Sequence, residues 1–151
     1  MDQTTLLRAH VERVLQDAWG VKDLEVDSDG DYRYRYDSAA CWVRIRPPID
    51  PDDQPCVEAF ALAAKGLKRS AKLLNEINAL NAAARWVKIA LEGDQIYVNY
   101  VLHMAGADRE ALLNATKAVG GVAADLGPVL SAVYGGDTPF KVKIEEPGEQ
   151  Q

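Results

Sequence analysis

The pattern of hydrophobic and polar positions first predicts a helix near the beginning of the chain. An apolar stripe runs from Leu7 to Ala18 at spacings of mainly three and four residues, which places it on one face of a helix. Thr4 or Thr5 can cap the first turn, and Gly20 can end the helix in a left-handed conformation. We therefore expect an amphipathic helix before the first strand.

Strict alternation follows over residues 32–37 and 41–46. Because successive side chains of a strand point to opposite faces, this pattern predicts an antiparallel pair with one buried face and one wet, basic face. The alternating sets are Tyr32, Tyr34 and Tyr36 against Arg33, Arg35 and Asp37, and then Cys41, Val43 and Ile45 against Trp42, Arg44 and Arg46. Pro47-Pro48 ends the second strand, because proline cannot donate to a ladder.

The middle of the chain contains both strand patterns and a helix pattern. Residues 56–64 are interpreted as a third strand, although their alanines make a helix the competing interpretation. A helix is expected over residues 70–84, followed by strands over 86–92 and 95–103 that are joined at Gly93-Asp94. The order is α-β-β-β-α-β-β-α once the last helix is added. We therefore expect an α+β fold, with one antiparallel sheet of about five strands and helices packed on it.

The last helix has an apolar stripe that extends to Val133, and Asp108 is its expected cap. Gly120 and Gly121 lie inside it, at a cost of roughly 1 kcal/mol each relative to alanine, which points to a close backbone approach. Gly127-Pro128 is expected to kink or split the helix. We expect one domain over residues 1–135 and a tail over 136–151 that forms an edge strand and then becomes disordered.

Charge and cysteine content narrow the classes of function. A net charge of −6 disfavours a nucleic-acid-binding protein, because phosphate contact needs a positive surface. Cys41 and Cys56 are isolated, without a CxxC motif, which fits reduced thiols in the cytoplasm. The first turns carry charges and contain no apolar run, so neither a signal peptide nor a membrane span is expected. We expect a cytoplasmic protein with no membrane partner.

Two sequence signatures resemble a known family. DSDGDYRYRY leads into the first strand, and LLNEINALN leads through RWVKIALEGDQIYVNYVLH into DREALLNATKAV. Together with the element order, they resemble the YbjN and type III secretion chaperone-like family of small peptide-binding domains, from about Leu7 to Tyr134. The resemblance implies a chaperone-like α+β domain that often dimerises and offers a surface to a polypeptide. It implies neither catalysis nor a role in a secretion system.

The residues that suggest chemistry have simpler explanations. An EF-hand loop counted from Asp27 would place Gly30 at position four, Tyr32 where glycine belongs and Ser38 where the bidentate glutamate belongs. An acidic turn before a strand explains the same residues, so we expect no metal site. The two histidines have no ligand or carboxylate at useful spacing, and GxSxG, HExxH, Walker A and GxGxxG are absent from the sequence. We expect neither an enzyme nor a cofactor.

We therefore expect a non-enzymatic chaperone-like or regulatory protein that binds a polypeptide client, as a homodimer. A small-ligand-binding or signalling domain with a pocket between the sheet and the long helix is the alternative. The tyrosine row is interpreted either as core packing or as a binding face, and the arginine face either as peptide recognition or as a solvated surface. The candidate partner contacts are Tyr32, Tyr34, Tyr36, Arg33, Arg35, Trp42, Arg44 and Arg46, and the candidate dimer contacts are Gly120, Gly121, Leu126 and Leu130.

Three asparagines are spaced three apart in the second helix. At 100° per residue, Asn75 lies opposite the apolar stripe, Asn78 lies on its flank and Asn81 lies at its edge. They are not expected to form a shared polar site. Asn81 stands where the helix must end and the next strand begin, and asparagine side chains can bond backbone groups at such ends.

Overall fold

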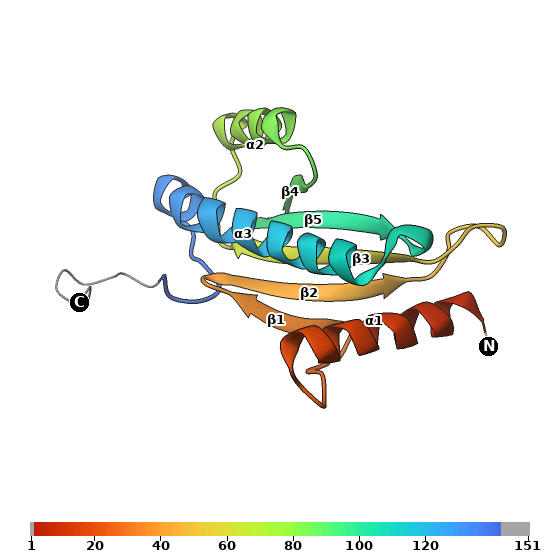
Figure 1. Cartoon of the computed structure of the whole chain (residues 1–151). Coiled ribbons are helices and arrows are strands. Elements are labelled where there is room, and N and C mark those ends of the chain that lie inside the picture. The colour runs from red at the N-terminus through yellow and green to blue at the C-terminus, as the bar shows by residue number, and fades with distance from the viewer. Residues whose placement is uncertain (1, 143–151) are drawn as a thin grey trace.

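The computed structural model describes residues 2–142, which form one five-stranded sheet with helices packed against it (Figure 1). The elements are α1 (Gln3–Trp19), β1 (Tyr32–Tyr36), β2 (Ala39–Arg46), β3 (Cys56–Ala64), α2 (Ala71–Ala83), β4 (Lys88–Glu92), β5 (Gln95–His103), the short 3-10 helix η1 (Met104–Gly106) and α3 (Arg109–Tyr134). Apart from η1, this is the predicted order. The α+β fold class is confirmed, and residues 56–64 are a strand rather than a helix.

The sheet is antiparallel throughout, and its strands lie in the order β1-β2-β3-β5-β4. Hairpins join β1 to β2 and β4 to β5, whereas β3 pairs with β5 across the inserted α2 and β4. The register places Val43 opposite Ala59, and Ala59 opposite Tyr100. β3 is therefore the central strand, while β1 and β4 are the edges.

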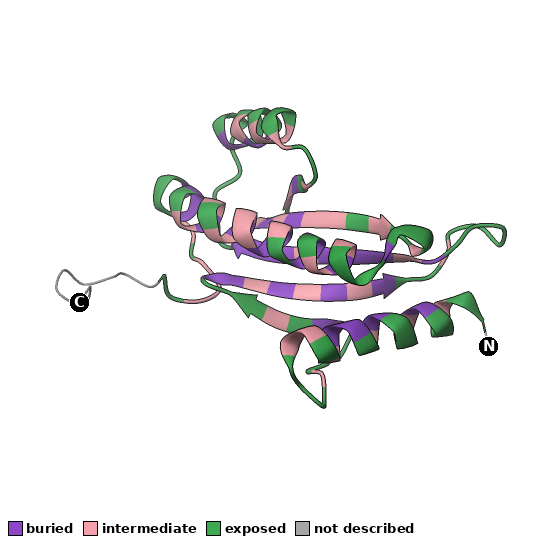
Figure 2. Ribbon diagram, viewed as in Figure 1, coloured by how far each residue is buried: buried purple, intermediate pink, exposed green. Residues whose placement is uncertain are grey.

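The helices bury their apolar sides against one face of this sheet. One cluster joins α1 and the start of α3 to β1 and β2, and a second joins the rest of α3 and α2 to β3, β4 and β5. Along β2 the burial alternates, with the odd-numbered residues Ala39 to Ile45 buried and the residues between them more exposed (Figure 2). The predicted alternation of β1 and β2 is thus confirmed, and the sheet has one face under helices and one without.

The cap of α1 differs from the prediction. Asp2, not Thr4 or Thr5, is the N-cap, and its carboxylate accepts a hydrogen bond of 2.8 Å from the Thr5 backbone N–H. An N-cap residue must be extended, and Asp2 has φ −76° and ψ 168° while the threonines are already helical. At the other end Gly20 has φ 63°, the left-handed ending that was predicted.

α3 is one continuous helix of 26 residues, so the predicted split at Gly127-Pro128 is wrong. Proline removes an N–H and so weakens the turn before it, but packing on the sheet holds this turn in place. The backbone of Gly127 approaches β3 so closely that a Cβ there would stand 2.2 Å from the Ala63 carbonyl oxygen. The close approach expected for Gly120 is also present, since a Cβ there would meet Tyr36 at 2.7 Å. Gly121 faces open space.

Asn81 joins α2 to the edge strand β4. Its side-chain amide donates to the Ile89 carbonyl at 2.7 Å, and its side-chain oxygen accepts from the Ile89 N–H at 2.8 Å. The asparagine therefore bonds Ile89 as a neighbouring strand would, on the side of β4 that faces away from β5. Asn75 and Asn78 are exposed, so the predicted role of Asn81 at the junction is confirmed.

The segment after α3 returns to the sheet without forming a strand. Asp137 and Lys65 exchange backbone hydrogen bonds of 2.9 and 2.8 Å, and the Phe140 N–H donates to the Ser38 carbonyl at 3.1 Å. Residues 138–142 have no strand structure, so this part of the expected edge strand is not formed. The rest of that prediction, over residues 143–151, lies outside the described residues. The domain boundary at residue 135 stays a prediction.

The contact between α3 and β3 predicts opposite effects of two neighbouring alanine substitutions. Gly127→Ala should lower the free energy of unfolding by about 2–3 kcal/mol, because the added Cβ must push the helix off the sheet. Gly121→Ala meets nothing and should raise it by about 0.5–1 kcal/mol through helix propensity. Urea denaturation of both variants measures the difference, and equal effects of the same sign would contradict this packing.

The Asn81 bridge predicts unequal effects of two asparagine substitutions in α2. Asn81→Leu removes both hydrogen bonds to Ile89 and should lower the free energy of unfolding by about 1–2 kcal/mol. Asn75→Leu changes an exposed position and should stay within about 0.5 kcal/mol. Thermal melting of the two variants gives the comparison. Equal and negligible changes in melting temperature would show that the bridge does not stabilise the fold.

Candidate partner-binding surfaces

The predicted contact residues lie on two different surfaces. The tyrosine row faces the helices: Tyr32 is 1% exposed, Tyr34 is half-buried and Tyr36 is 39% exposed. The Tyr32 hydroxyl donates to Glu12 at 2.6 Å and accepts from Arg8 at 3.1 Å, and burial raises the pKa of Tyr32 to about 12. Tyr32 therefore packs in the core in this fold, and Tyr36 is the most accessible of the three.

The face without helices carries a row of aromatic side chains across three strands. Trp42 of β2 stacks on Phe60 of β3 with ring centroids 5.2 Å apart, and Phe60 lies 6.4 Å from the ring of Tyr97 on β5. This arrangement follows from the register, which places Trp42 opposite Phe60 and Phe60 opposite Asn99. We call this side of the sheet the open face.

Carboxylates on the open face already bind two of the candidate arginines. Arg44 makes a bidentate contact with Asp31, with hydrogen bonds of 3.1 and 2.7 Å, and its guanidinium lies 4.6 Å from the centre of the Phe60 ring. Arg46 lies 3.4 Å from Glu58, which is only 6% exposed. The hydrogen bond with Asp31 raises the pKa of Arg44, while desolvation opposes the rise. The open face is therefore zwitterionic rather than basic, which corrects the expectation of a wet, basic surface.

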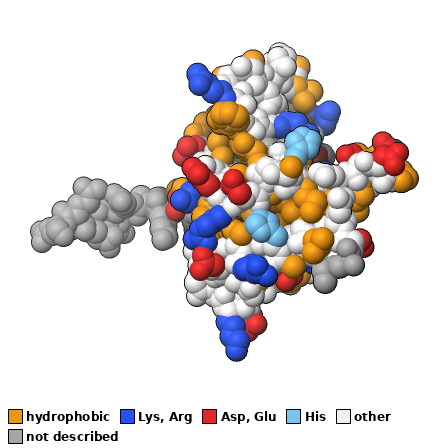
Figure 3. Space-filling model, turned by 45° about the vertical axis from the view of Figure 1, so that its right-hand side comes forward, with side chains coloured by type: hydrophobic (Ala, Val, Ile, Leu, Met, Phe, Trp, Pro, Cys, Tyr) orange, Lys and Arg blue, Asp and Glu red, His pale blue; other side chains and the backbone are white. Residues whose placement is uncertain are grey.

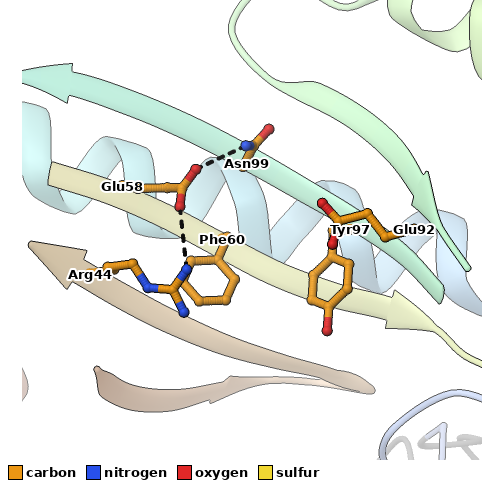
Figure 4. A pocket seen from close by; sticks show the side chains of 6 residues that line it. All are labelled: Arg44, Glu58, Phe60, Glu92, Tyr97 and Asn99. Carbon is orange, nitrogen blue, oxygen red and sulfur yellow. Dashed lines mark hydrogen bonds and ion pairs between the residues drawn. The ribbon is translucent and has the colours of Figure 1, made fainter. Parts of the chain in front are cut away.

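A cleft of about 190 Å³ lies in the middle of the open face (Figure 4). The Glu58 carboxylate lies between Arg44 and Asn99, whose side-chain amide donates to it at 3.0 Å. Phe60 lies beside Arg44, and Tyr97 and Glu92 stand at the other end. The cleft thus combines aromatic surface with hydrogen-bonding groups that neighbouring side chains hold in place.

Other candidate residues lie apart from the cleft. Arg33 makes an exposed ion pair of 3.6 Å with Glu25, and Arg35 stacks on Phe140 at 4.2 Å from the ring centre. Sequence reasoning missed Glu58, Phe60 and Asn99 as contributors to the open face. Their strands could be recognised, but only the sheet order β2-β3-β5 shows that they lie beside Arg44 and Trp42.

The aspartate cluster before β1 is explained by hydrogen bonding. Carboxylate oxygens of Asp27, Asp29 and Asp31 lie within 4.8 Å of one another. One Asp27 oxygen accepts from the backbone N–H groups of Asp29 and Asp31 at 2.9 and 3.0 Å, as in a turn. Asp31 also forms the ion pair with Arg44. These contacts support the interpretation of the cluster as an acidic turn.

A second apolar surface lies beside α2. A groove of about 320 Å³ runs between α2, the start of β4 and α3, and Trp86 at its rim is 72% exposed. The expected strand over residues 86–92 begins only at Lys88, so Trp86 lies in the preceding loop. The other residues that line this groove are all apolar except Arg85: Leu80, Ala83, Ala84, Arg85, Val87, Ile89, Ala118, Val122 and Leu126.

The candidate dimer residues also fall into two groups, one buried in the core and one partly exposed. Gly120 faces Tyr36 and Leu130 is 1% exposed, so both lie in the core of the chain and cannot contact a second copy in this fold. Gly121 is partly exposed and Leu126 lines the α2 groove. The apolar side chains that α3 turns outward are instead Val129 and Val133, each 57% exposed.

Under the middle of α3, the space between the helix and the sheet is filled with side chains, whereas a surface hollow of about 450 Å³ lies between Trp86, Tyr100 of β5 and the first half of α3. Four side chains at the contact between α3 and the sheet are 3% exposed or less: Ala59, Ala61, Val119 and Ala123. Burial raises the pKa of the Cys41 thiol to about 12, so this thiol is protonated at neutral pH. On the face shown in Figure 3, hydrophobic side chains form several patches separated by acidic and basic ones. The cavities described above open to the surface, which disfavours the alternative of an enclosed ligand pocket.

The chain thus forms an open antiparallel sheet with helices on one face and an aromatic row on the other. The chain belongs to a family of peptide-binding chaperones: residues 5–142 match the family model described as T3SS (YopN, CesT) and YbjN peptide-binding chaperone 1. The resemblance seen in the sequence is therefore confirmed. Among the described residues, no helix has the length and apolar character that a membrane span requires.

Two solved structures have the same fold. The crystal structure of the ExsC–ExsE complex matches with a TM-score of 0.59 and 11% identity, covering 86% of this chain and 97% of that chain. The Yersinia pestis type III secretion chaperone SycH, in complex with a stable fragment of YscM2, matches with a TM-score of 0.56 and 17% identity, covering 80% and 98%. A comparison with curated proteins gives no match.

Proposed function

We propose that this protein is a non-enzymatic chaperone that holds an extended segment of another polypeptide on the open face of its sheet. The observation that carries the proposal is the row formed by Trp42, Phe60 and Tyr97, which lies beside a preformed polar cleft on a face that no described helix covers. The family description and the two complexes, SycH with a YscM2 fragment and ExsC with ExsE, support a polypeptide partner.

The chemistry of the open face suits an extended chain. Aromatic rings supply large contact area at a low cost in conformational entropy, and they are enriched where binding energy concentrates. Arg44, Glu58 and Asn99 hold one another in place, so their remaining donor and acceptor positions are preorganised for a partner's polar groups. Such a face takes apolar side chains on the rings and polar groups at the cleft.

Peptide binding at the cleft predicts a dependence on the ring of Tyr97. An array of overlapping peptides should contain a set that the wild-type protein binds, and Tyr97→Ala should weaken that binding at least about tenfold, or about 1.4 kcal/mol. Tyr97→Phe keeps the ring and loses only the hydroxyl bond to Gln95, so it should bind within about threefold of the wild type. Fluorescence anisotropy with the best peptides gives the affinities.

Two results would contradict the proposal. One is an array in which no peptide binds more tightly than about 100 μM, equivalent to about 5.5 kcal/mol. The other is equal affinity of the wild type and Tyr97→Ala, with both proteins folded by circular dichroism. The second result would mean that the peptide binds to another surface of the protein.

We also propose a homodimer that joins the apolar side of α2 and the outer side of α3. The exposed apolar side chains there are Leu74, Trp86, Val129 and Val133. A stable dimer needs about 1,200–2,000 Å² of buried surface with an apolar centre, and the groove beside Trp86 offers such a centre. This location replaces the buried Gly120 and Leu130 of the sequence-based prediction.

The dimer predicts a change of mass in one of two matched variants. At about 50 μM, wild-type protein should have twice its monomer mass of 16.5 kDa by light scattering, and Trp86→Asp should reduce this to the monomer. Ile49→Asp makes a comparable substitution at a residue that is 93% exposed on a loop, and it should leave the dimer intact. A monomeric wild type, or a dimeric Trp86→Asp, would contradict the proposed interface.

A further inference from the structure

A further groove lies on the helix side of the sheet, beside the edge strand β1. It has a volume of about 280 Å³ and lies between the end of α1, the edge strand β1 and the first half of α3. Its apolar part is formed by Trp19, Tyr34 and Tyr36, and Arg35, Arg109 and Lys117 also line it. No carboxylate lines this groove, whereas Glu58 and Glu92 line the cleft on the open face.

The aromatic part of the groove is held in place by the fold. Trp19 and Tyr34 lie with ring centroids 5.2 Å apart, and the Tyr34 hydroxyl donates to the Thr116 carbonyl at 2.7 Å. Gly120 leaves room for Tyr36, because a Cβ there would stand 2.7 Å from the tyrosine. These contacts fix the rings before any partner arrives, so little conformational entropy is lost when the groove is filled.

The charges around the groove are unusual for this chain. The protein carries a net charge of −6, yet all three charged residues that line this groove are basic. Arg109 forms an exposed ion pair with Asp17, and Arg35 donates a hydrogen bond to the Asp37 carbonyl and stacks on Phe140. Among the described residues, Lys117 takes part in none of the ion pairs. The groove is therefore locally positive and complements an acidic ligand.

We propose that this groove binds an acidic segment of the client polypeptide, with one large apolar side chain on the rings and flanking Asp or Glu side chains at Arg109 and Lys117. The inference rests on the proposed chaperone function and adds a second contact on the opposite side of the sheet. A nucleic acid also combines stacking bases with negative charge, but a chain of this net charge and a site with only three cations favour a peptide.

The test uses fluorescein-labelled ten-residue peptides and the full chain. The first peptide has a central leucine flanked by four aspartates in a Gly-Ser background, the second replaces the aspartates with lysines, and the third replaces the leucine with alanine. The first peptide should bind at least about tenfold more tightly than either of the others, by anisotropy. Its affinity should fall as NaCl rises from 50 to 500 mM, because salt screens exposed charges.

Two charge reversals locate this binding on the protein. Lys117→Glu should weaken the aspartate–leucine peptide at least about tenfold, whereas Lys68→Glu should leave its affinity within about twofold. Both lysines are exposed, so both variants are expected to fold. The backbone N–H of Lys68 donates to Tyr134 at the end of α3, about 26 Å along the helix from Lys117. The control therefore makes the same charge change far from the groove.

Three results would overturn the inference: equal binding of the aspartate and lysine peptides, no effect of Lys117→Glu, or tighter binding of oligothymidylate than of the acidic peptide. None of these depends on Tyr97. If the groove results fail while array peptides still require Tyr97, the chaperone proposal stands and only the groove is wrong. If the array yields no peptide at all while the acidic peptide binds as described, the open face is wrong and the groove stands.

Discussion

The backbone of α3 packs directly on the central strand β3, and this close contact determines how the other helices and both faces of the sheet are arranged. Gly127 lies against the Ala63 carbonyl, and Ala59 and Ala61 leave room for the helix along the same strand. Larger side chains at these positions would hold the helix off the sheet. Because α3 lies flat on this face, α1 and α2 can pack beside it, and the apolar residues of the sheet are buried on one side (Figure 2).

The packing of α3 on β3 also determines which surfaces of the protein remain available to bind a partner. With the helices on one side, the other side of the sheet must satisfy its own polar groups and protect its aromatic side chains. It does so with bonds between charged side chains, in which the nearly buried Glu58 is held by Arg46 and Asn99. At the rims of the helix layer, two grooves remain where α3 meets α1 and α2. The binding proposals follow from this division into a covered and an uncovered face.

Much of this fold could be predicted from local sequence pattern. The alternation of β1 and β2, the cap Asp108 and the bridging position of Asn81 depend on neighbours in sequence, and the structure agrees with them. The cap of α1 is predicted two or three residues too late, which is a local error, whereas two other errors have a common cause. The continuous helix through Pro128 and the neutralised Arg44 depend on partners far away in the sequence, on β3 and before β1. Periodicity identifies the elements but not their order in the sheet, which decides which side chains meet.

An NMR titration of the isotope-labelled protein, with a peptide that it binds in the array, tests where the polypeptide lies on this fold. If the peptide binds on the open face, the largest chemical-shift changes of side-chain and backbone signals will occur at Trp42, Phe60, Tyr97 and Asn99. These residues lie on three adjacent strands and share the open face, on which Figure 4 shows Phe60, Tyr97 and Asn99. Changes confined to α2 and the outer side of α3, with the open face unaffected, would contradict this location of the peptide.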